Sequence, residues 1–176
     1  MPHPPKLHRI TTEFIDEEDR LKITGISEDK ETLIFWFTQR LLSRLIIHCV
    51  SWLDEASPEL TKAKTINPES RAEFQGLVQE SARQSLQKED AVIATLGSKS
   101  LLVKEVDVNL NDEGALFVFK EGNKKIAELA LSVQHLRQWL IIIHNLWQKA
   151  NWPMAIWPDW IIQSGEEELS SSVPVH

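Results

Sequence analysis

Two stretches of the chain, Thr38–Leu53 (TQRLLSRLIIHCVSWL) and Ser132–Trp147 (SVQHLRQWLIIIHNLW), decide its fold. Each begins with a hydroxyl residue that suits a helix N-cap, because its oxygen can accept a hydrogen bond from a free backbone N–H of the first turn. Apolar residues follow at spacings of three and four, which is the pattern of one helical face. Further apolar residues lie off that face: Leu41, Ile47, Trp52, Ile141 and Ile142. We therefore expect two helices, to about residues 55 and 150, that are apolar around more of their circumference than one sheet contact requires.

Short β-branched and aromatic runs, separated by polar turns, precede each of these helices. They predict strands at residues 7–14, 21–26 and 32–37 in the first half, and at 91–96, 101–110, 116–120 and 126–131 in the second. Asn111-Asp112-Glu113-Gly114 is a hairpin turn, because Asp and Gly tolerate the positive φ that such turns need. Gly97-Ser98-Lys99-Ser100 is interpreted as another turn.

A third helix is expected between the halves, after a loop at residues 57–66. Asn67-Pro68-Glu69 is a good helix start, with a cap residue, Pro at the first helical position and an acid in the first turn. The helix extends to about Lys88 and carries a thin apolar stripe among Gln, Ser, Glu and Arg, which places it on the surface. The stripe residues are Phe74, Leu77, Val78, Ala82 and Leu86.

The predicted order, βββα-α-(β)βββα, defines an α+β domain. We expect an antiparallel sheet or sandwich of about six or seven strands, two apolar helices and an inserted helix. Residues 1–162 form the domain, with halves 7–56 and 91–150 joined by the loop and helix at 57–90. Residues 163–176 are acidic and Ser-rich, which predicts a flexible tail.

The two halves repeat the same order of elements, and a shift of 94 residues aligns Thr38 with Ser132. The same shift aligns Phe37 with Leu131, Leu42 with Leu136, Leu45 with Trp139, Ile46 with Leu140 and Leu53 with Trp147. One interpretation is that any two strand-to-helix units look alike. The other is a duplication, or a pseudo-symmetric sheet with both helices on one face.

The element order over roughly residues 7 to 150 resembles two known architectures. One is the head domain of the eukaryotic end-joining scaffold and centriolar cartwheel proteins, which implies a dimerising C-terminal helix. The other is the whirly-type fold, two sheet-plus-helix repeats, which implies binding of single-stranded nucleic acid. The likeness is one of element order, and fold alone does not fix function.

Composition narrows the function classes. The formal net charge of the 176 residues is -7, which disfavours a general phosphate-binding surface because nucleic-acid affinity rests on clustered Lys and Arg. Arg40 with Arg44, and Lys120 with Lys124 and Lys125, are small basic clusters, so nucleic-acid binding stays an alternative. With one cysteine, no apolar signal segment and no run long enough to span a bilayer, we expect a cytoplasmic protein without a membrane partner.

No motif predicts a metal, a cofactor or catalysis. His135 and His144 share a helix but, nine residues apart, point in opposite directions at about 100° per residue. Cys49 lies on the apolar face of the first long helix and is interpreted as a core residue with a raised pKa. Asp16–Asp19 lacks the spaced ligands of a calcium loop, and residues 97–100 lack the glycine spacing of a phosphate loop. Whether the chain is an enzyme stays open, and we lean against it.

The C-terminal segment alternates large rings with prolines: Trp152-Pro153, Trp157-Pro158 and Trp160. Either it folds back onto the last long helix or the sheet, or it binds a partner, because Trp is enriched at binding hot spots. We predict a homodimeric interaction or assembly module without enzymatic activity. Its predicted interface residues are Trp139, Ile143, Trp147, Trp152, Trp157 and Trp160. The alternatives are a whirly-like single-stranded nucleic-acid binder, and a small enzyme or ligand-binding protein whose site is not visible in the sequence.

Overall fold

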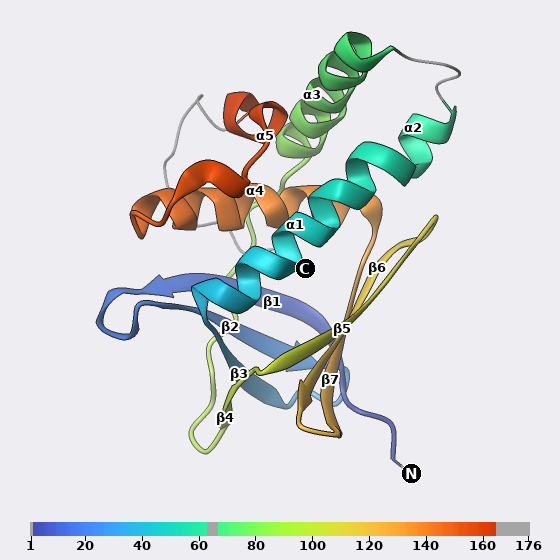
Figure 1. Cartoon of the computed structure of the whole chain (residues 1–176). Helices are drawn as coiled ribbons and strands as arrows, with labels where there is room; N and C mark the ends of the chain where they lie inside the picture. Colours follow the sequence, from blue (N-terminus) through green and yellow to red (C-terminus); the bar gives the residue numbers. More distant parts are fainter. Residues whose placement is uncertain (1, 63–66, 165–176) are drawn as a thin grey trace.

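The computed structural model describes residues 2–62 and 67–164, and shows seven strands in one mixed sheet with helices packed above it (Figure 1). The strands are β1 (Lys6–Ile15), β2 (Arg20–Ser27), β3 (Thr32–Phe37), β4 (Lys99–Leu102), β5 (Glu105–Asn111), β6 (Gly114–Glu121) and β7 (Lys124–Leu131). The α-helices are α1 (Gln39–Ala56), α2 (Pro58–Lys62), α3 (Pro68–Gln84), α4 (Val133–Lys149) and α5 (Asp159–Ser164). Two 3-10 turns are η1 (Asp16–Glu18) and η2 (Met154–Ile156). The α+β class is confirmed.

The sheet has the order β4-β3-β2-β1-β7-β6-β5. The sequence predicted an antiparallel sheet or a sandwich, but the structure has one sheet that also contains parallel pairs. Each half contributes an antiparallel meander. The meanders are joined by a short parallel pairing of β1 with β7, in which Lys6 faces Glu128 and Leu7 faces Leu129. A second parallel pair adds β4 beside β3. Parallel partners come from distant parts of the chain, so local sequence patterns could not reveal them.

The sheet is curled tightly on itself, as shown by the phenylalanines of its inner face. The ring of Phe119 on β6 lies 5.0 Å from that of Phe35 and 5.3 Å from that of Phe37, both on β3. Three strands separate β3 from β6 in the sheet order. In a flat sheet the two strands would be about 19 Å apart, at roughly 4.8 Å per step. The edge strands β4 and β5 are also joined by only two residues, Val103 and Lys104. The fold is therefore an open, barrel-like sheet.

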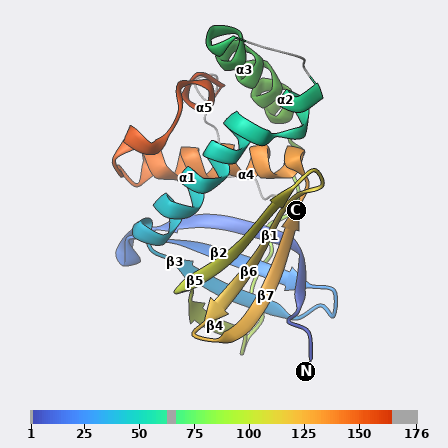
Figure 2. The ribbon, with the colours of Figure 1, turned by 45° about the vertical axis from the view of Figure 1, so that its right-hand side comes forward.

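Helices α1 and α4 cover one end of this curled sheet, and α3 and α5 form a further layer above them (Figure 2). Helix α4 lies between the sheet and α3, and side chains from Leu136 to Trp147 are buried almost all round it. Contacts within one chain therefore account for the apolar residues that lie on nearly every side of α4. The predicted caps are confirmed, since Thr38 accepts from the Leu41 N–H, Asn67 from the Ser70 N–H and Ser132 from the His135 N–H.

The chain between α3 and β4 differs from its prediction. Residues 91–96 are not a strand; they cross the outer face of the sheet, where the Val92 N–H donates to the Thr11 hydroxyl oxygen at 2.8 Å. The Thr95 N–H donates to the Thr32 hydroxyl oxygen at 3.0 Å. The predicted turn at 97–100 runs into β4, and the predicted strand 101–110 is split into β4 and β5 at the corner where the sheet curls.

Two connections also depart from expectation. The predicted loop at residues 57–66 contains α2, whose first residue is Pro58. Helix α3 ends at Gln84, four residues before the expected end. Helix α5 extends to Ser164, so the first two residues of the predicted tail are helical, and residues 165–176 lie outside the described part of the chain.

The aligned positions of the two halves have matching environments. Leu42 and Leu136, Leu45 and Trp139, Ile46 and Leu140, and Leu53 and Trp147 are all buried. Helices α1 and α4 lie on the same face of the sheet (Figure 1). This geometry fits a pseudo-symmetric arrangement.

Gly114 provides a test of the junction between β6, β7 and α4. Its φ is +130°, and a Cβ at this position would lie 2.0 Å from the Leu131 carbonyl oxygen. We expect Gly114→Ala to lower the free energy of unfolding by more than about 4 kcal/mol, because backbone atoms cannot move aside cheaply. Urea denaturation measures the change. Gly122→Ala is the control: its φ is +60° with open space around the Cβ, so the expected cost is about 1 kcal/mol.

Candidate functional site

The six predicted interface residues all lie inside the single chain, with 6% or less of each side chain exposed. The C-terminal segment folds back onto α4, so the rings of Trp152 and Trp157 lie 4.8 and 5.7 Å from that of Trp147. The indole N–H of Trp152 donates to Asp19 at 2.8 Å, and that of Trp147 donates to the Pro153 carbonyl at 2.9 Å. The fold-back alternative therefore describes this segment.

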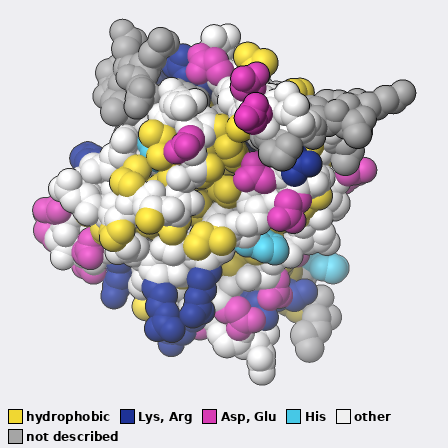
Figure 3. Space-filling view, turned by 45° about the horizontal axis from the view of Figure 1, so that its top comes forward, with side chains coloured by type: hydrophobic (Ala, Val, Ile, Leu, Met, Phe, Trp, Pro, Cys, Tyr) yellow, Lys and Arg dark blue, Asp and Glu magenta, His cyan; other side chains and the backbone are white. Residues whose placement is uncertain are grey.

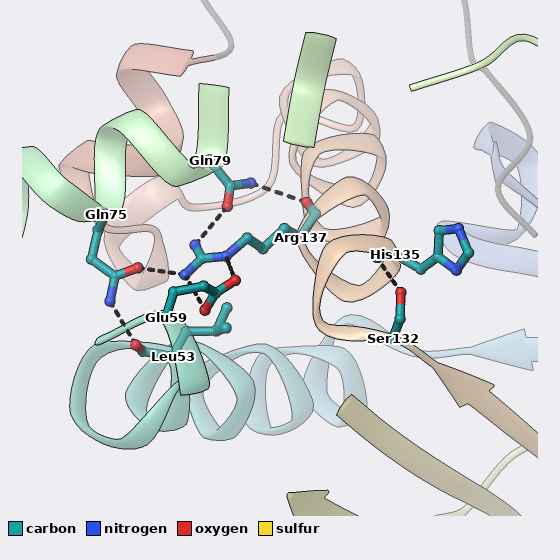
Figure 4. Close-up of polar contacts among 7 residues, drawn as sticks. All are labelled: Leu53, Glu59, Gln75, Gln79, Ser132, His135 and Arg137. Carbon is teal, nitrogen blue, oxygen red and sulfur yellow. Dashed lines mark hydrogen bonds and ion pairs between the residues drawn. The ribbon is translucent and has the colours of Figure 1, made fainter. Parts of the chain in front are cut away.

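A buried polar network centred on Arg137 holds the helical layer together (Figure 4). The Arg137 guanidinium donates to Gln79 at 3.1 Å, to Gln75 at 2.7 Å and to Glu59 at 3.3 Å. The Gln75 amide donates in turn to the Leu53 carbonyl near the end of α1, at 2.6 Å. One side chain of α4 thus fixes α1, α2 and α3 relative to one another.

Arg137 is fully buried, and its environment supports the positive charge. Burial lowers the pKa of Arg137, while the nearby carboxylates of Glu59 and Asp54 oppose this shift. The guanidinium carbon also lies 5.6 Å from the centre of the Trp160 ring, a cation–π distance. These contacts explain how α3 can bury the polar side chains of Gln75 and Gln79. Of the predicted apolar stripe, Ala82 is buried with them, whereas Leu77 is 71% exposed.

His144 occupies a second buried polar position. Its ring stacks edge-on against Trp157 at 5.0 Å, and neither ring nitrogen has a well-aligned hydrogen bond to a described residue. Burial lowers the pKa of His144, with a smaller opposing effect from the adjacent Asn145. The side chain is therefore neutral near pH 7 and serves as an aromatic packing group.

The other candidate groups for chemistry are dispersed. Across residues 2–62 and 67–164, the His, Cys, Asp and Glu side chains form no group of three or more able to hold a metal ion. Burial raises the pKa of the Cys49 thiol to about 12, so this thiol is protonated near pH 7. Within the same described residues, every helix is too short or too polar to traverse a bilayer.

The small basic clusters have different surroundings. Lys120 is held by Glu105 at 2.7 Å and Asp107 at 3.2 Å, which neutralise it. Lys124 and Lys125 lie beside a groove at the end of the sheet opposite the helices. Arg40 and Arg44 are exposed on α1. The clusters therefore do not merge into one basic track.

The most distinctive exposed surface is the outer stripe of α1, formed by residues spaced by four and three. Arg40, Arg44, Ile47 and Ser51 are exposed along this stripe, and Asp54, which is half-buried and hydrogen-bonded to the Trp160 side chain, continues it. Ile47 lies at the centre of the stripe and is 48% exposed. The buried side chains of α1 lie on the opposite face of the helix. Helix α1 also contacts η2, where Pro153 and Ala155 are exposed and Met154 and Ile156 partly so.

The charge along this stripe changes sign from one end to the other. Two arginines lie before Ile47, whereas Asp54 and Glu55 follow it. Figure 3 shows hydrophobic side chains gathered on this side of the molecule, with a group of Lys and Arg side chains below them and Asp and Glu side chains above, to the left and below. We define the α1 stripe as these six residues, 40, 44, 47, 51, 54 and 55. Sequence patterns missed it because it contains a single apolar residue.

Comparisons with protein-family models, curated proteins and solved structures find no match to this chain. The likeness of element order to the cartwheel-type head domain and to the whirly-type fold therefore stays a resemblance.

The Arg137 network generates a stability prediction. Arg137→Met leaves Gln75 and Gln79 without their donor and Glu59 without its cation, and we expect it to cost about 3–5 kcal/mol of unfolding free energy. Adding Gln75→Leu and Gln79→Leu should recover part of the loss, because the buried amides are then removed. Arg20→Met is the control: its pair with Glu18 spans 3.7 Å at the surface, so its cost stays below about 1 kcal/mol. Equal losses in urea denaturation for the two single variants contradict the assignment.

His144 predicts a dependence of stability on pH. Its pKa is lowered in the folded chain, so the unfolded chain binds the extra proton first as the pH falls below about 6.5. The stabilisation is complete above that pH and is lost below it, by at most about 1.4 kcal/mol per pH unit. His144→Phe keeps a ring against Trp157 and should flatten the curve of unfolding free energy between pH 7 and 5. The exposed His135→Gln variant should keep the wild-type slope, and a His144→Phe curve parallel to wild type contradicts the assignment.

Proposed function

We propose that this protein is a non-enzymatic interaction module that forms a homodimer through the α1 stripe. The proposal rests on one observation: the stripe is self-complementary about Ile47. Arg40 lies seven residues before Ile47 and Asp54 lies seven residues after it. Seven residues span about 10.5 Å of helix, so the opposite charges are equidistant from the centre.

Two copies of α1 packed antiparallel about a two-fold axis through Ile47 satisfy this pattern. Arg40 of each copy then faces Asp54 of the other, with Glu55 beside it, and the two Ile47 side chains meet at the axis. A two-fold contact is the commonest way for identical chains to associate, because the same patch serves both partners. The exposed residues of η2 add apolar area beside the helix pair. Opposite charges across the contact favour the antiparallel direction and oppose the parallel one.

The assembly role follows from the symmetry of this surface. A dimer built on α1 leaves the sheet, its open end and the α3–α5 layer free, so each copy can present a further binding surface. The single, buried cysteine suits a reducing compartment such as the cytoplasm, because no disulfide is needed to hold the fold.

Cysteine cross-linking tests the dimer directly. Ile47→Cys places two thiols at the proposed axis, and we expect mild oxidation to give a disulfide-linked dimer at roughly tens of micromolar protein. Cys49 does not interfere, since its thiol is buried with a pKa of about 12. Leu77→Cys, on the exposed side of α3, is the matched control and should stay monomeric under the same oxidant. Light scattering that gives a monomer mass for the wild-type chain at this concentration overturns the proposal.

A charge exchange separates this interface from other modes of self-association. Arg40→Glu and Glu55→Arg each place like charges across the contact and should weaken the dimer, measured by sedimentation, about tenfold. The double variant restores opposite charges and should recover most of the affinity. Independent effects of the two changes, with no recovery in the double variant, argue against the antiparallel pairing.

A further inference from the structure

The end of the curled sheet opposite the helices contains a groove of about 1080 Å³. Figures 1 and 2 show the N-terminal segment, the loop before β4 and the β6–β7 turn together at this end. The groove is walled by residues 2–5, the turn between β2 and β3, the turn leading into β4 and the turn between β6 and β7. Its volume is slightly above the range of about 300–1,000 Å³ found for small-molecule sites, which often occupy the mouths of barrels.

The floor of the groove is apolar. Leu33, Leu101 and Ile126 line it, and all three belong to or pack against the hydrophobic core. On the rim, Leu96 is fully exposed. An apolar ligand segment placed here would extend the core outward, and would remove from water a leucine that the folded chain leaves uncovered.

The rim carries four lysines, Lys30, Lys99, Lys124 and Lys125. None of them forms an ion pair with a carboxylate in the described part of the chain, in contrast to Lys22 and Lys120. Three carboxylates, Glu31, Glu121 and Glu128, interrupt the lysines around the rim. A polyanion with charges along its length would meet these carboxylates, whereas a single anionic group can be held between lysines.

Lys30 adds a backbone observation. Its φ is +65°, in the left-handed region that favours glycine, at the turn between β2 and β3. A lysine here costs stability that a glycine would not, and such strain is often found where the side chain serves binding. The turn brings Lys30 to the rim of the groove.

We infer that this groove binds an amphipathic monoanion, a ligand with one carboxylate or sulfonate group and an apolar body. The apolar body lies on Leu33, Leu101 and Ile126, and the anionic group meets the rim lysines. The groove lies at the opposite end of the sheet from the α1 stripe, so this inference does not depend on the proposed dimer.

Decanoate is the probe for this site, with displacement of the fluorescent sulfonate 1-anilinonaphthalene-8-sulfonate as the readout on the full chain. We expect decanoate to displace the dye, and decyltrimethylammonium, which has the same chain length and the opposite charge, to do so at least tenfold less well. A Lys99→Glu, Lys124→Glu double variant should bind decanoate at least tenfold more weakly. Lys88→Glu, an exposed site outside the groove, controls for net charge and should bind as wild type.

Lys30→Gly distinguishes binding from folding. It removes one rim charge and relieves the left-handed backbone, so the urea midpoint should rise while decanoate affinity falls about threefold or more. For the wild-type chain, the inference is overturned if decanoate does not bind at millimolar concentration or if the cationic amphiphile displaces the dye equally well. For the variants, it is overturned if Lys88→Glu loses as much decanoate affinity as the Lys99/Lys124 variant. Unchanged decanoate affinity in the Lys99/Lys124 variant or in Lys30→Gly overturns it as well.

Discussion

The contact of Phe119 with Phe35 and Phe37 is the constraint on which the rest of the structure depends. It joins two strands separated by three others, which is possible only if the sheet curls around a packed interior. Once curled, the sheet has two ends. One is covered by α1 and α4, whereas the other is bordered by turns and by the start of the chain. The two surfaces proposed to bind, the α1 stripe and the groove, follow from this division.

The helical layer has its own constraint, because α3 packs on α4 through buried amide side chains that need hydrogen-bond partners. Arg137 resolves this by offering donors to Gln75 and Gln79, so that a polar face of α3 packs on α4 without unsatisfied amides. The same guanidinium reaches Glu59 on α2 and the ring of Trp160 on α5. The layer is thus oriented by directional polar contacts, whereas the barrel interior is filled by aromatic packing.

The features that sequence patterns predicted correctly are those set by neighbouring residues. Thr38, Asn67 and Ser132 cap their helices because capping needs only a side-chain oxygen and the next turn of backbone. The turn at Asn111–Gly114 likewise depends on local φ. The parallel pairs and the placement of residues 91–98 on the outer face depend on contacts such as Thr11 with Val92, 81 residues apart. No periodicity encodes such contacts. Residues 101–110 were therefore predicted as one strand although the structure splits them into β4 and β5, and residues 91–96 were predicted as a strand although they only cross the outer face of the sheet.

The same limit applies to the predicted interface residues, which contacts within the single chain already bury. Apolar girth was interpreted as surface to be covered by a partner, but the covering elements are α3 and the C-terminal segment of the same chain. Trp139 and Trp147 are therefore core residues. Once the inner face of α1 is known, the remaining positions form a stripe whose charges are antisymmetric about Ile47. That pattern is legible in the sequence, but a helix with apolar residues on several sides has no unique outer face. Burial has to be known before the stripe can be separated from the core.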